Sequence, residues 1–393
     1  MTSQPLCIDD HKKQALLINP HGAMAAMFTV FGLGVGLWSG ASGSVLARAG
    51  VSAPVFGVAM TFFMAAYLAA MSSGGFFGAR FGLRRVLLVG VPLQGLLVAL
   101  LLVAESAATI FVSLIAFGVF AGLVDLTMNA EGARVEKDLG RPILAGLHGG
   151  ASSGIALGAI AGSLIAVNIG SWLSALIALA AALAVTAWIY AATPERGRDR
   201  AQEAPSGRRA LMTRSLIVLG VVIGVSVAGE GAATYWSSLL LQTEAPKLAA
   251  ISGLGAALFC AFQAALRLNA DRVRRLVSDK RLIIVSLAVA ASGFVVVAAH
   301  AGFLATVIGF AIIGVGTGSI MPCGVALAVG HKGFSAGAAL STIALFGALP
   351  RLPAPLAMGA IASYFSLSGA FALFAVLLVL ACAGMRFFDP DHS

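Results

Sequence analysis

Hydrophobic residues in this chain are gathered into twelve long runs that short polar segments separate. A helix needs about 20 apolar residues, each rising about 1.5 Å, to cross a hydrocarbon core of about 30 Å. Each run has about this length. The pattern therefore predicts twelve membrane-spanning helices, near 23–46, 54–77, 86–104, 107–130, 143–167, 171–192, 215–240, 248–268, 282–299, 302–325, 336–363 and 367–386.

A hydrophilic stretch after the sixth run divides these runs equally. We expect an all-α membrane protein with two pseudo-symmetric six-helix bundles, over 1–193 and 215–393, joined by a central loop over 194–214. The first run follows a polar segment and is too long for the apolar part of a signal peptide. We therefore expect the first span to be retained.

Composition supports a membrane protein. Hydrophobic residues make up 59% of the chain and charged residues only 10%, against about 25% in soluble domains. With a mean hydropathy of +0.97, this excludes cytosolic enzymes, secreted disulfide scaffolds and nucleic-acid-binding domains. The four cysteines lie far apart without metal-ligand spacing, and no nucleotide-binding motif occurs. We expect no metal site and no cofactor.

The positions of lysine and arginine indicate topology, because these residues collect in cytoplasmic loops. If both termini are cytoplasmic, 22 of the 25 basic residues fall on the cytoplasmic side, Arg48 and Lys247 fall outside, and Arg351 lies within the eleventh run. We therefore predict a multi-pass protein of the cytoplasmic (inner) membrane with both termini inside. The membrane topology thus accounts for the net charge of +9, and no nucleic-acid partner is needed to explain it.

The two halves share weak internal similarity. Gly118 and Gly122 in the fourth run correspond to Gly314 and Gly318 in the tenth, 196 residues later. Parallel repeats of this kind are common in transporters.

The chain has two sets of six runs, a charged central loop and a basic turn after the second and eighth runs. In these features it resembles the major facilitator superfamily. The loop pattern G-x-x-x-D-R-x-G-R-R of that family is matched by Gly75, Arg80, Gly82 and Arg84, and departs from it at Ala79, where the family usually has aspartate. The resemblance implies a cytoplasmic gate at this turn and at the corresponding turn of the second half. The gate candidates are Arg80, Arg84, Glu136 and Asp271. For Glu136 the alternative is a plainly solvated charge.

A narrower resemblance is to the MosC-like branch of this superfamily and, more distantly, to fucose:proton symporters. It rests on Asp125, Asn129, Glu136, the segment 147–149, Glu230-Gly231 and Trp236-Ser237. In those symporters the acid of the fourth helix takes part in proton coupling, so the resemblance carries this role to Asp125. Their second acid, on the first helix, has no equivalent in the segment 37–40, which makes fucose itself a poor candidate.

Four ionisable residues fall within the predicted spans or at their edges: Asp125, His148, Glu230 and Arg351. An uncompensated charge at the bilayer centre costs about 3 kcal/mol, so such residues usually face a cavity or a partner. Low dielectric disfavours the charged form of a carboxylate, which suits Asp125 to bind and release a proton. Asn129, four residues later, shares its helical face. The alternative for Asp125 is a packing role between helices.

The other candidates follow from depth in the membrane. Glu230 and Arg351 each lie fifteen residues into an outward-running span, so we expect them to pair, either at a substrate site or as a permanent structural salt bridge. Tyr235 and Trp236 would supply a stacking face for the substrate. His148 either contacts Asp125 or caps nearby backbone at the interface.

Weaker candidates and backbone features complete the picture. Trp38 is a weaker lining candidate, for which core packing is the favoured alternative. Glycines at every fourth position from 150 to 162 predict close helix approach. Three prolines within 350–355 predict a kink or local unwinding around Arg351.

These features favour a monomeric secondary transporter that takes up a small polar solute, of a sugar, polyol or inositol type, together with protons. The alternatives are proton-coupled efflux and a non-transporting receptor or assembly factor. An enzyme is not expected, because the string Gly150-Ala-Ser152-Ser-Gly154 lies within a predicted helix and lacks the strand-to-helix turn of a nucleophile elbow.

Overall fold

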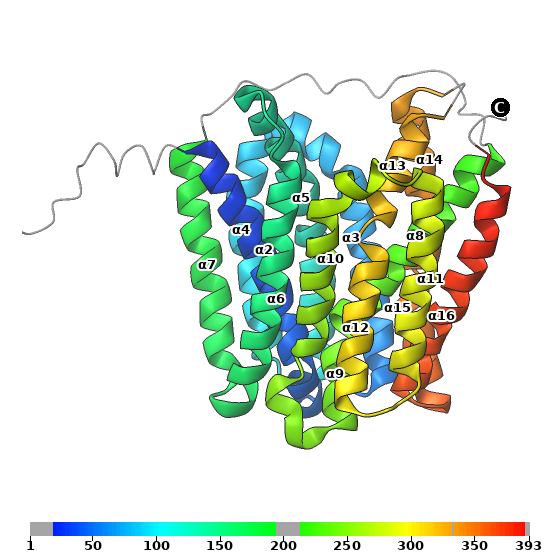
Figure 1. Ribbon diagram of the computed structural model, residues 1–393. Coiled ribbons are helices and arrows are strands. Elements are labelled where there is room, and N and C mark those ends of the chain that lie inside the picture. The colour runs from blue at the N-terminus through cyan, green and yellow to red at the C-terminus, as the bar shows by residue number, and fades with distance from the viewer. Residues whose placement is uncertain (1–18, 194–212, 332–333, 390–393) are drawn as a thin grey trace, which may run out of the picture.

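The computed structural model describes residues 19–193, 213–331 and 334–389, which Figure 1 shows as ribbon. The side chains at 270 and 271 also lie outside the described part. Across the described ranges the chain forms helices and no strands. Twelve helices there are long and apolar enough to cross a membrane, which confirms the predicted number. Most of the predicted central loop lies outside these residues, so the expected domain boundaries stay a prediction.

The N-terminal half consists of six continuous helices. They are α2 (Pro20–Arg48), α3 (Ala53–Phe81), α4 (Leu83–Leu102), α5 (Ala107–Leu139), α6 (Leu144–Asn168) and α7 (Ser171–Ala192). Proline and capping side chains set several of their starts. Asn19, for example, accepts a hydrogen bond from the backbone N–H of Gly22 at 3.1 Å, and Pro20 occupies the first turn.

The C-terminal half has six spans, of which several are interrupted. They are α8 (Arg214–Tyr235) with α9 (Ser237–Glu244), η1 (Pro246–Ile251) with α10 (Leu254–Arg274), α11 (Asp279–Ala298), α12 (Phe303–Thr317) with α13 (Ile320–Val329), α14 (Ala336–Arg351) with α15 (Ala354–Tyr364), and α16 (Leu367–Gly384) with η2 (Met385–Phe387). The break between α14 and α15 confirms the interruption that the prolines around Arg351 predict. The break after Thr317 precedes Pro322 in the first turn of α13, whereas the break after Tyr235 has no nearby proline.

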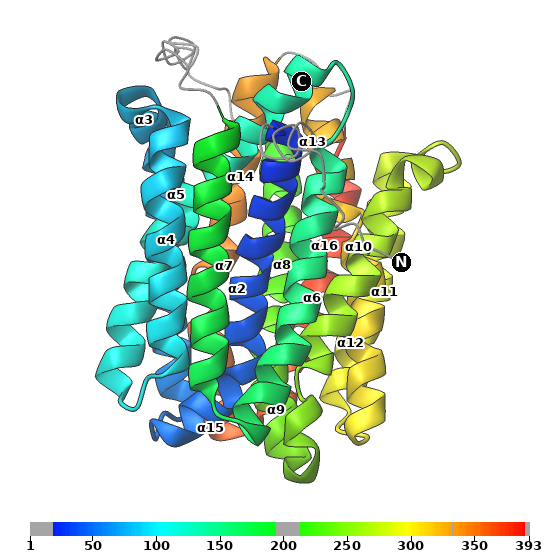
Figure 2. The same ribbon diagram turned by 90° about the vertical axis from the view of Figure 1, so that its left-hand side faces the viewer.

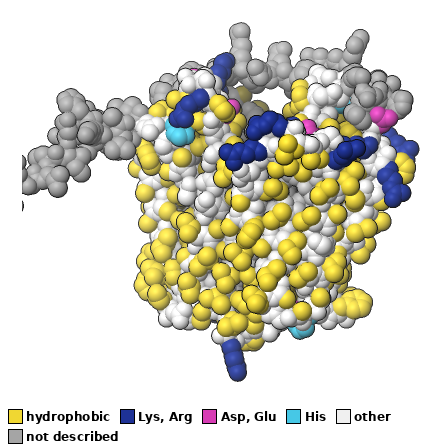
Figure 3. All heavy atoms as spheres, in the orientation of Figure 1, with side chains coloured by type: hydrophobic (Ala, Val, Ile, Leu, Met, Phe, Trp, Pro, Cys, Tyr) yellow, Lys and Arg dark blue, Asp and Glu magenta, His cyan; other side chains and the backbone are white. Residues whose placement is uncertain are grey.

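The start of α2 and the end of α16 lie at the same end of the helix bundle (Figure 1). We call this end, where α2 begins and α16 ends, the terminal face, and the opposite end the distal face. In Figure 3 lysine and arginine side chains gather at the terminal face, whereas apolar side chains cover the flanks. This is the charge asymmetry that the sequence predicts.

Glycines let α2 and α6 pack closely, and Figure 2 shows the two helices side by side. A side-chain carbon at Gly154 or Gly162 would collide with the backbone of α2, at the carbonyl oxygens of Thr29 and Leu37. At Gly158 it would lie 2.6 Å from the carbonyl oxygen of Leu33. The structure therefore confirms that the glycine stripe serves close helix approach.

The repeat of 196 residues recurs in the packing. Gly118 and Gly122 let α5 approach α3, because side chains there would meet the carbonyl oxygens of Phe63 and Tyr67. The equivalent pair lets α12 approach α10 at the equivalent positions. There, the close contacts join Gly314 to Phe259 and Gly318 to Gln263. The two halves thus use one packing scheme to place Tyr67 and Gln263.

Candidate functional site

A cavity of about 300 Å³ lies between the two halves; we call it the central cavity. The side chains of α2, α3, α5 and α6 face those of α8, α10 and α14 across it. Its polar lining residues are Tyr67, Asp125, His148, Ser152, Glu230, Thr234, Tyr235, Gln263, Arg267 and Arg351. The aromatic rings in its wall are those of Phe31, Phe63, Phe117 and Phe259, besides the two tyrosines. The cavity thus combines apolar walls with a few converging polar groups, as ligand sites do.

Contacts between the halves close the cavity on its distal side. The Ser39 hydroxyl donates a hydrogen bond to the carbonyl oxygen of Thr234, and the Ser238 hydroxyl donates one to that of Gly40 at 2.7 Å. The rings of Phe56 and Trp236 meet at 4.7 Å between centroids. On the terminal side, the cavity wall reaches the exposed His148.

Two further contacts at this seam are related by the same repeat. A side-chain carbon at Gly57 would lie 2.6 Å from the carbonyl oxygen of Pro355, which joins α3 to α15. At Gly253, 196 residues later, it would collide with the carbonyl oxygen of Ala159, which joins the start of α10 to α6. Only glycine permits either approach.

Asp125 lies on α5 and is held by two neighbours. The Tyr67 hydroxyl, on α3, donates a hydrogen bond to Oδ2 of Asp125. Asn129 Nδ2 donates to Oδ1 at 3.0 Å and to the Asp125 carbonyl oxygen at 2.8 Å. Asn129 is absent from the cavity lining, and it holds Asp125 from one helical turn away. An acid fixed by uncharged donors in a cavity is suited to exchange a proton.

Arg351 faces the same part of the cavity from the other half. It ends α14, directly before the break, and its Cζ lies 5.9 Å from the centre of the Tyr67 ring. Its Nε is buried and has no hydrogen-bond partner. Arg351 forms no salt bridge with any residue in the described ranges.

Glu230 pairs with Arg267, so the expected pair of Glu230 with Arg351 is wrong. Arg267 Nη2 lies 3.2 Å from Glu230 Oε2, and the two side chains are 31% and 16% exposed. The sequence assigned Arg267 to a cytoplasmic loop because it ends an apolar run. Its long side chain reaches back into the cavity from α10.

His148 shares the central cavity with Asp125, and no hydrogen bond joins them. Its ring meets that of Phe28 edge-on at 5.2 Å. Tyr235 also lines the cavity, with its ring 5.8 Å from that of Phe63 across the two halves.

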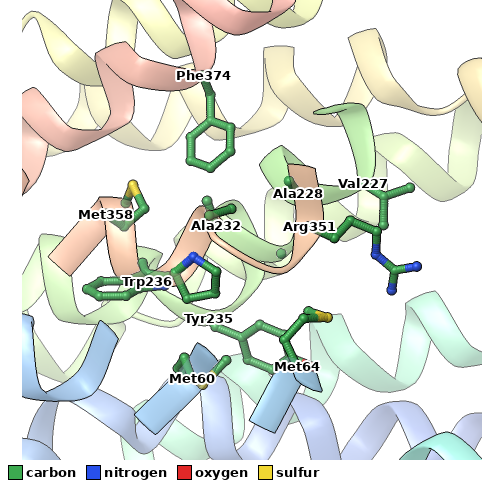
Figure 4. A pocket seen from close by; sticks show the side chains of 13 residues that line it. Met60, Met64, Val227, Ala228, Ala232, Tyr235, Trp236, Arg351, Met358 and Phe374 are labelled. Atoms are coloured by element: carbon green, nitrogen blue, oxygen red, sulfur yellow. The ribbon is translucent and has the colours of Figure 1, made fainter. Parts of the chain in front are cut away.

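Trp236 lies elsewhere than expected, whereas Trp38 packs in the core, the alternative favoured for it. Both are fully buried on the distal side, where Phe56 packs against each of them, and neither lines the central cavity. Trp236 instead borders a small apolar pocket of about 20 Å³, shown in Figure 4 with Met60, Met358 and Phe374. This pocket has room for about one water-sized group.

Two of the four gate candidates, Arg84 and Glu136, contact their own half. Arg84 Nη2 donates to the carbonyl oxygen of Tyr190 at 2.8 Å, on α7. Glu136 accepts hydrogen bonds from the backbone N–H groups of Ile143 and Leu144, at 2.7 and 2.9 Å, and so caps α6. Arg80 is exposed at the end of α3. The Asp271 side chain lies outside the described residues.

Sequence reasoning missed Tyr67 and Arg267. Tyr67 carries no formal charge, and its one signal was a polar-tipped aromatic residue within an apolar run. In the described part of the chain, no group of three His, Cys, Asp or Glu side chains could hold a metal ion.

The sequence model of the Major Facilitator Superfamily matches residues 22–277. The chain belongs to this superfamily. An uncharacterised MFS-type transporter of Yersinia pestis is 27% identical over 360 residues, which are 91% of this chain and 93% of the relative. Membrane protein MosC of Rhizobium meliloti is 26% identical over 373 residues, 94% of this chain and 90% of MosC. These matches confirm both the superfamily and the likeness to MosC.

Solved structures of this superfamily share the fold. A D-xylose-proton symporter aligns with a TM-score of 0.75 at 17% identity, over 94% of this chain and 97% of that one. The likeness confirms the two six-helix bundles that the sequence predicts.

Proposed function

We propose that this protein is a secondary active transporter that takes up a small polar solute together with protons by alternating access. The observation that carries the proposal is the central cavity, which lies between the two halves and holds Asp125 on one wall and Arg351 on the other. A cavity that is closed on one side and lined by both halves is what alternating access requires.

Asp125 is the proposed proton site. It is the one acid of the cavity whose hydrogen-bond partners, Tyr67 and Asn129, are uncharged, whereas Glu230 is neutralised by Arg267. A proton on Asp125 therefore changes the charge of the cavity without breaking an ion pair. His148, on the wall that reaches toward the terminal face, is the proposed relay between Asp125 and water.

The size and lining of the cavity favour a small polar solute. A volume of about 300 Å³ lies at the low end of the usual range for ligand pockets, about 300–1,000 Å³. Hydroxyl, amide and charged groups alternate with aromatic rings, which suits a sugar, a polyol or an inositol. The shared fold with a D-xylose-proton symporter is consistent with this class.

We assign the terminal face to the cytoplasm, because basic residues gather there. The cavity then faces inward in this structure, and its distal side is closed to the outside. Both halves of the cavity come from one chain, so a monomer suffices for transport.

Proton flux in proteoliposomes tests this function. The purified full chain would be reconstituted with a pH-sensitive dye inside, and D-glucose, D-galactose, myo-inositol, D-glucuronate and D-galacturonate would be added in turn. We expect at least one of these five probes to evoke acidification of the lumen, as symport requires. Alkalinisation would indicate exchange and so efflux. The absence of flux with every probe would contradict a transport function for this class of solute.

A further inference from the structure

We infer that the transported solute carries a carboxylate, and that Arg351 binds it. This inference rests on the proposed function, because it names the class of solute that the central cavity takes. Arg351 is a cation in a membrane-spanning region; it lines the central cavity, and its guanidinium makes no hydrogen bond to a described residue. A charged group without hydrogen bonds in such a place is costly, so we expect a ligand to complete it.

No acid of the cavity is free to do so. Asp125 is engaged by Tyr67 and Asn129, and Glu230 lies in its ion pair with Arg267. The two cavity acids thus accept hydrogen bonds from other residues in the described structure, whereas the guanidinium of Arg351 makes no hydrogen bond to a described residue. The missing anion therefore comes from the solute.

The setting of Arg351 suits a carboxylate. The guanidinium carbon lies 5.9 Å from the centre of the Tyr67 ring, within the range of a cation–π contact. Figure 4 shows the guanidinium pointing away from Met358 and Trp236 and so out of the small apolar pocket. A planar guanidinium matches a carboxylate with two parallel hydrogen bonds. A doubly charged phosphate would need a second free cation, and Arg267 is already paired.

Charge balance gives this site a consequence for coupling. With Asp125 ionised and Arg351 empty, the formal charges of Asp125, Arg351, Glu230 and Arg267 cancel. A proton alone leaves the cavity with one positive charge, and a carboxylate alone leaves it with one negative charge. Both together restore neutrality. A net charge in low dielectric is costly. The state that holds both the proton and the carboxylate and the state that holds neither are therefore favoured over the two states that hold only one of them.

Two matched pairs of probes test the inference in proteoliposomes, D-glucose with D-glucuronate and D-galactose with D-galacturonate. Each pair differs by a carboxylate in place of a hydroxymethyl group. We expect uptake of an acid that a pH gradient drives and that a potassium diffusion potential leaves unchanged, because one proton and one monoanion move together. Uptake of the neutral sugars at an equal or greater rate, with a response to the potential, would overturn the inference and leave the proposed function intact. Binding of the acids without proton movement would support the carboxylate site and contradict the proposed proton-coupled transport.

Variants locate the binding group. Arg351→Gln is expected to weaken acid binding, measured by thermal shift of the full chain in detergent, by about tenfold to a hundredfold, as for loss of a charge-assisted hydrogen bond. Arg351→Lys keeps the charge and should retain part of the affinity. The control Arg386→Gln lies on an exposed residue at the terminal face and should leave binding unchanged. Equal binding of both members of each pair, no binding of any acid, or stronger binding of inorganic phosphate would each overturn the carboxylate assignment.

Discussion

The Tyr67 hydroxyl donates a hydrogen bond to the Asp125 carboxylate, and this contact links two helices of one half at the point where the other half presents Arg351. Tyr67 therefore touches both charged groups that face each other across the central cavity. The contact depends on the close approach of α3 and α5, which Gly118 and Gly122 permit.

Tyr67→Phe should impair proton-coupled uptake while leaving the fold intact. The change removes one hydrogen bond to Asp125, worth about 1.5–3 kcal/mol when the acceptor is charged, and keeps the ring under Arg351. Uptake driven by a pH gradient should fall by about tenfold or more. Tyr190→Phe is the matched control, since Tyr190 contacts Arg84 through its ring and carbonyl oxygen, away from the cavity. Equal losses in both variants would argue against a coupling role for Tyr67.

The Glu230–Arg267 pair should behave as one unit. Glu230→Gln leaves Arg267 without its partner, and because both side chains are partly exposed the cost to stability should be about 1–3 kcal/mol. Exchanging the two residues, Glu230→Arg with Arg267→Glu, should restore part of the melting temperature measured in detergent. The exchange of Glu230 with Arg351 should restore none. If only the exchange of Glu230 with Arg351 restored the melting temperature, Glu230 would pair with Arg351, as its depth in the membrane predicts.

Gly122→Ala should separate α3 from α5. The added methyl group would collide with the carbonyl oxygen of Tyr67, and overpacking of this kind costs about 1–3 kcal/mol. We expect a lower melting temperature together with loss of coupled uptake. Gly75→Ala, at a position on α3 with open space around it, should be neutral or slightly stabilising. A neutral result at Gly122 would mean that the helices can separate without disturbing Asp125.

Gly57→Val should hold the transporter open toward the distal face. The larger side chain cannot fit against Pro355, so the distal contacts between the halves cannot form. The measurement is labelling of Ser39→Cys from the distal side, in a chain whose four natural cysteines are replaced. Ser39 is fully buried here, so labelling should be slow in the parent and fast with Gly57→Val. Gly146→Val, at an open position on α6, is the control and should label like the parent.

The architecture could be predicted from the sequence because the length of each hydrophobic run identifies a membrane span. The twelve spans, the glycine stripe of α6 and the break beside Arg351 all follow from local residue types. The ends were less accurate. α5 continues to Leu139, nine residues past its predicted end, because its last turns leave the apolar run and carry charged residues.

Partner choice within the cavity could not be predicted from the sequence. These helices are apolar on all sides, so periodicity does not reveal which face meets the cavity. Trp38 faces Phe56, whereas Phe31 and Val35 on the same helix line the cavity. Depth alone placed Glu230 beside Arg351, but Arg267 reaches it from α10.

Transport by Asp125→Asn tests the central claim most directly. The variant keeps the size of the side chain and removes its ability to exchange a proton. It would be measured in proteoliposomes with whichever of the five probes the parent takes up fastest. We predict that uphill uptake under a pH gradient is abolished, whereas exchange of labelled for unlabelled probe at equal concentrations continues at close to the parent rate. Normal uphill accumulation by Asp125→Asn would contradict the account.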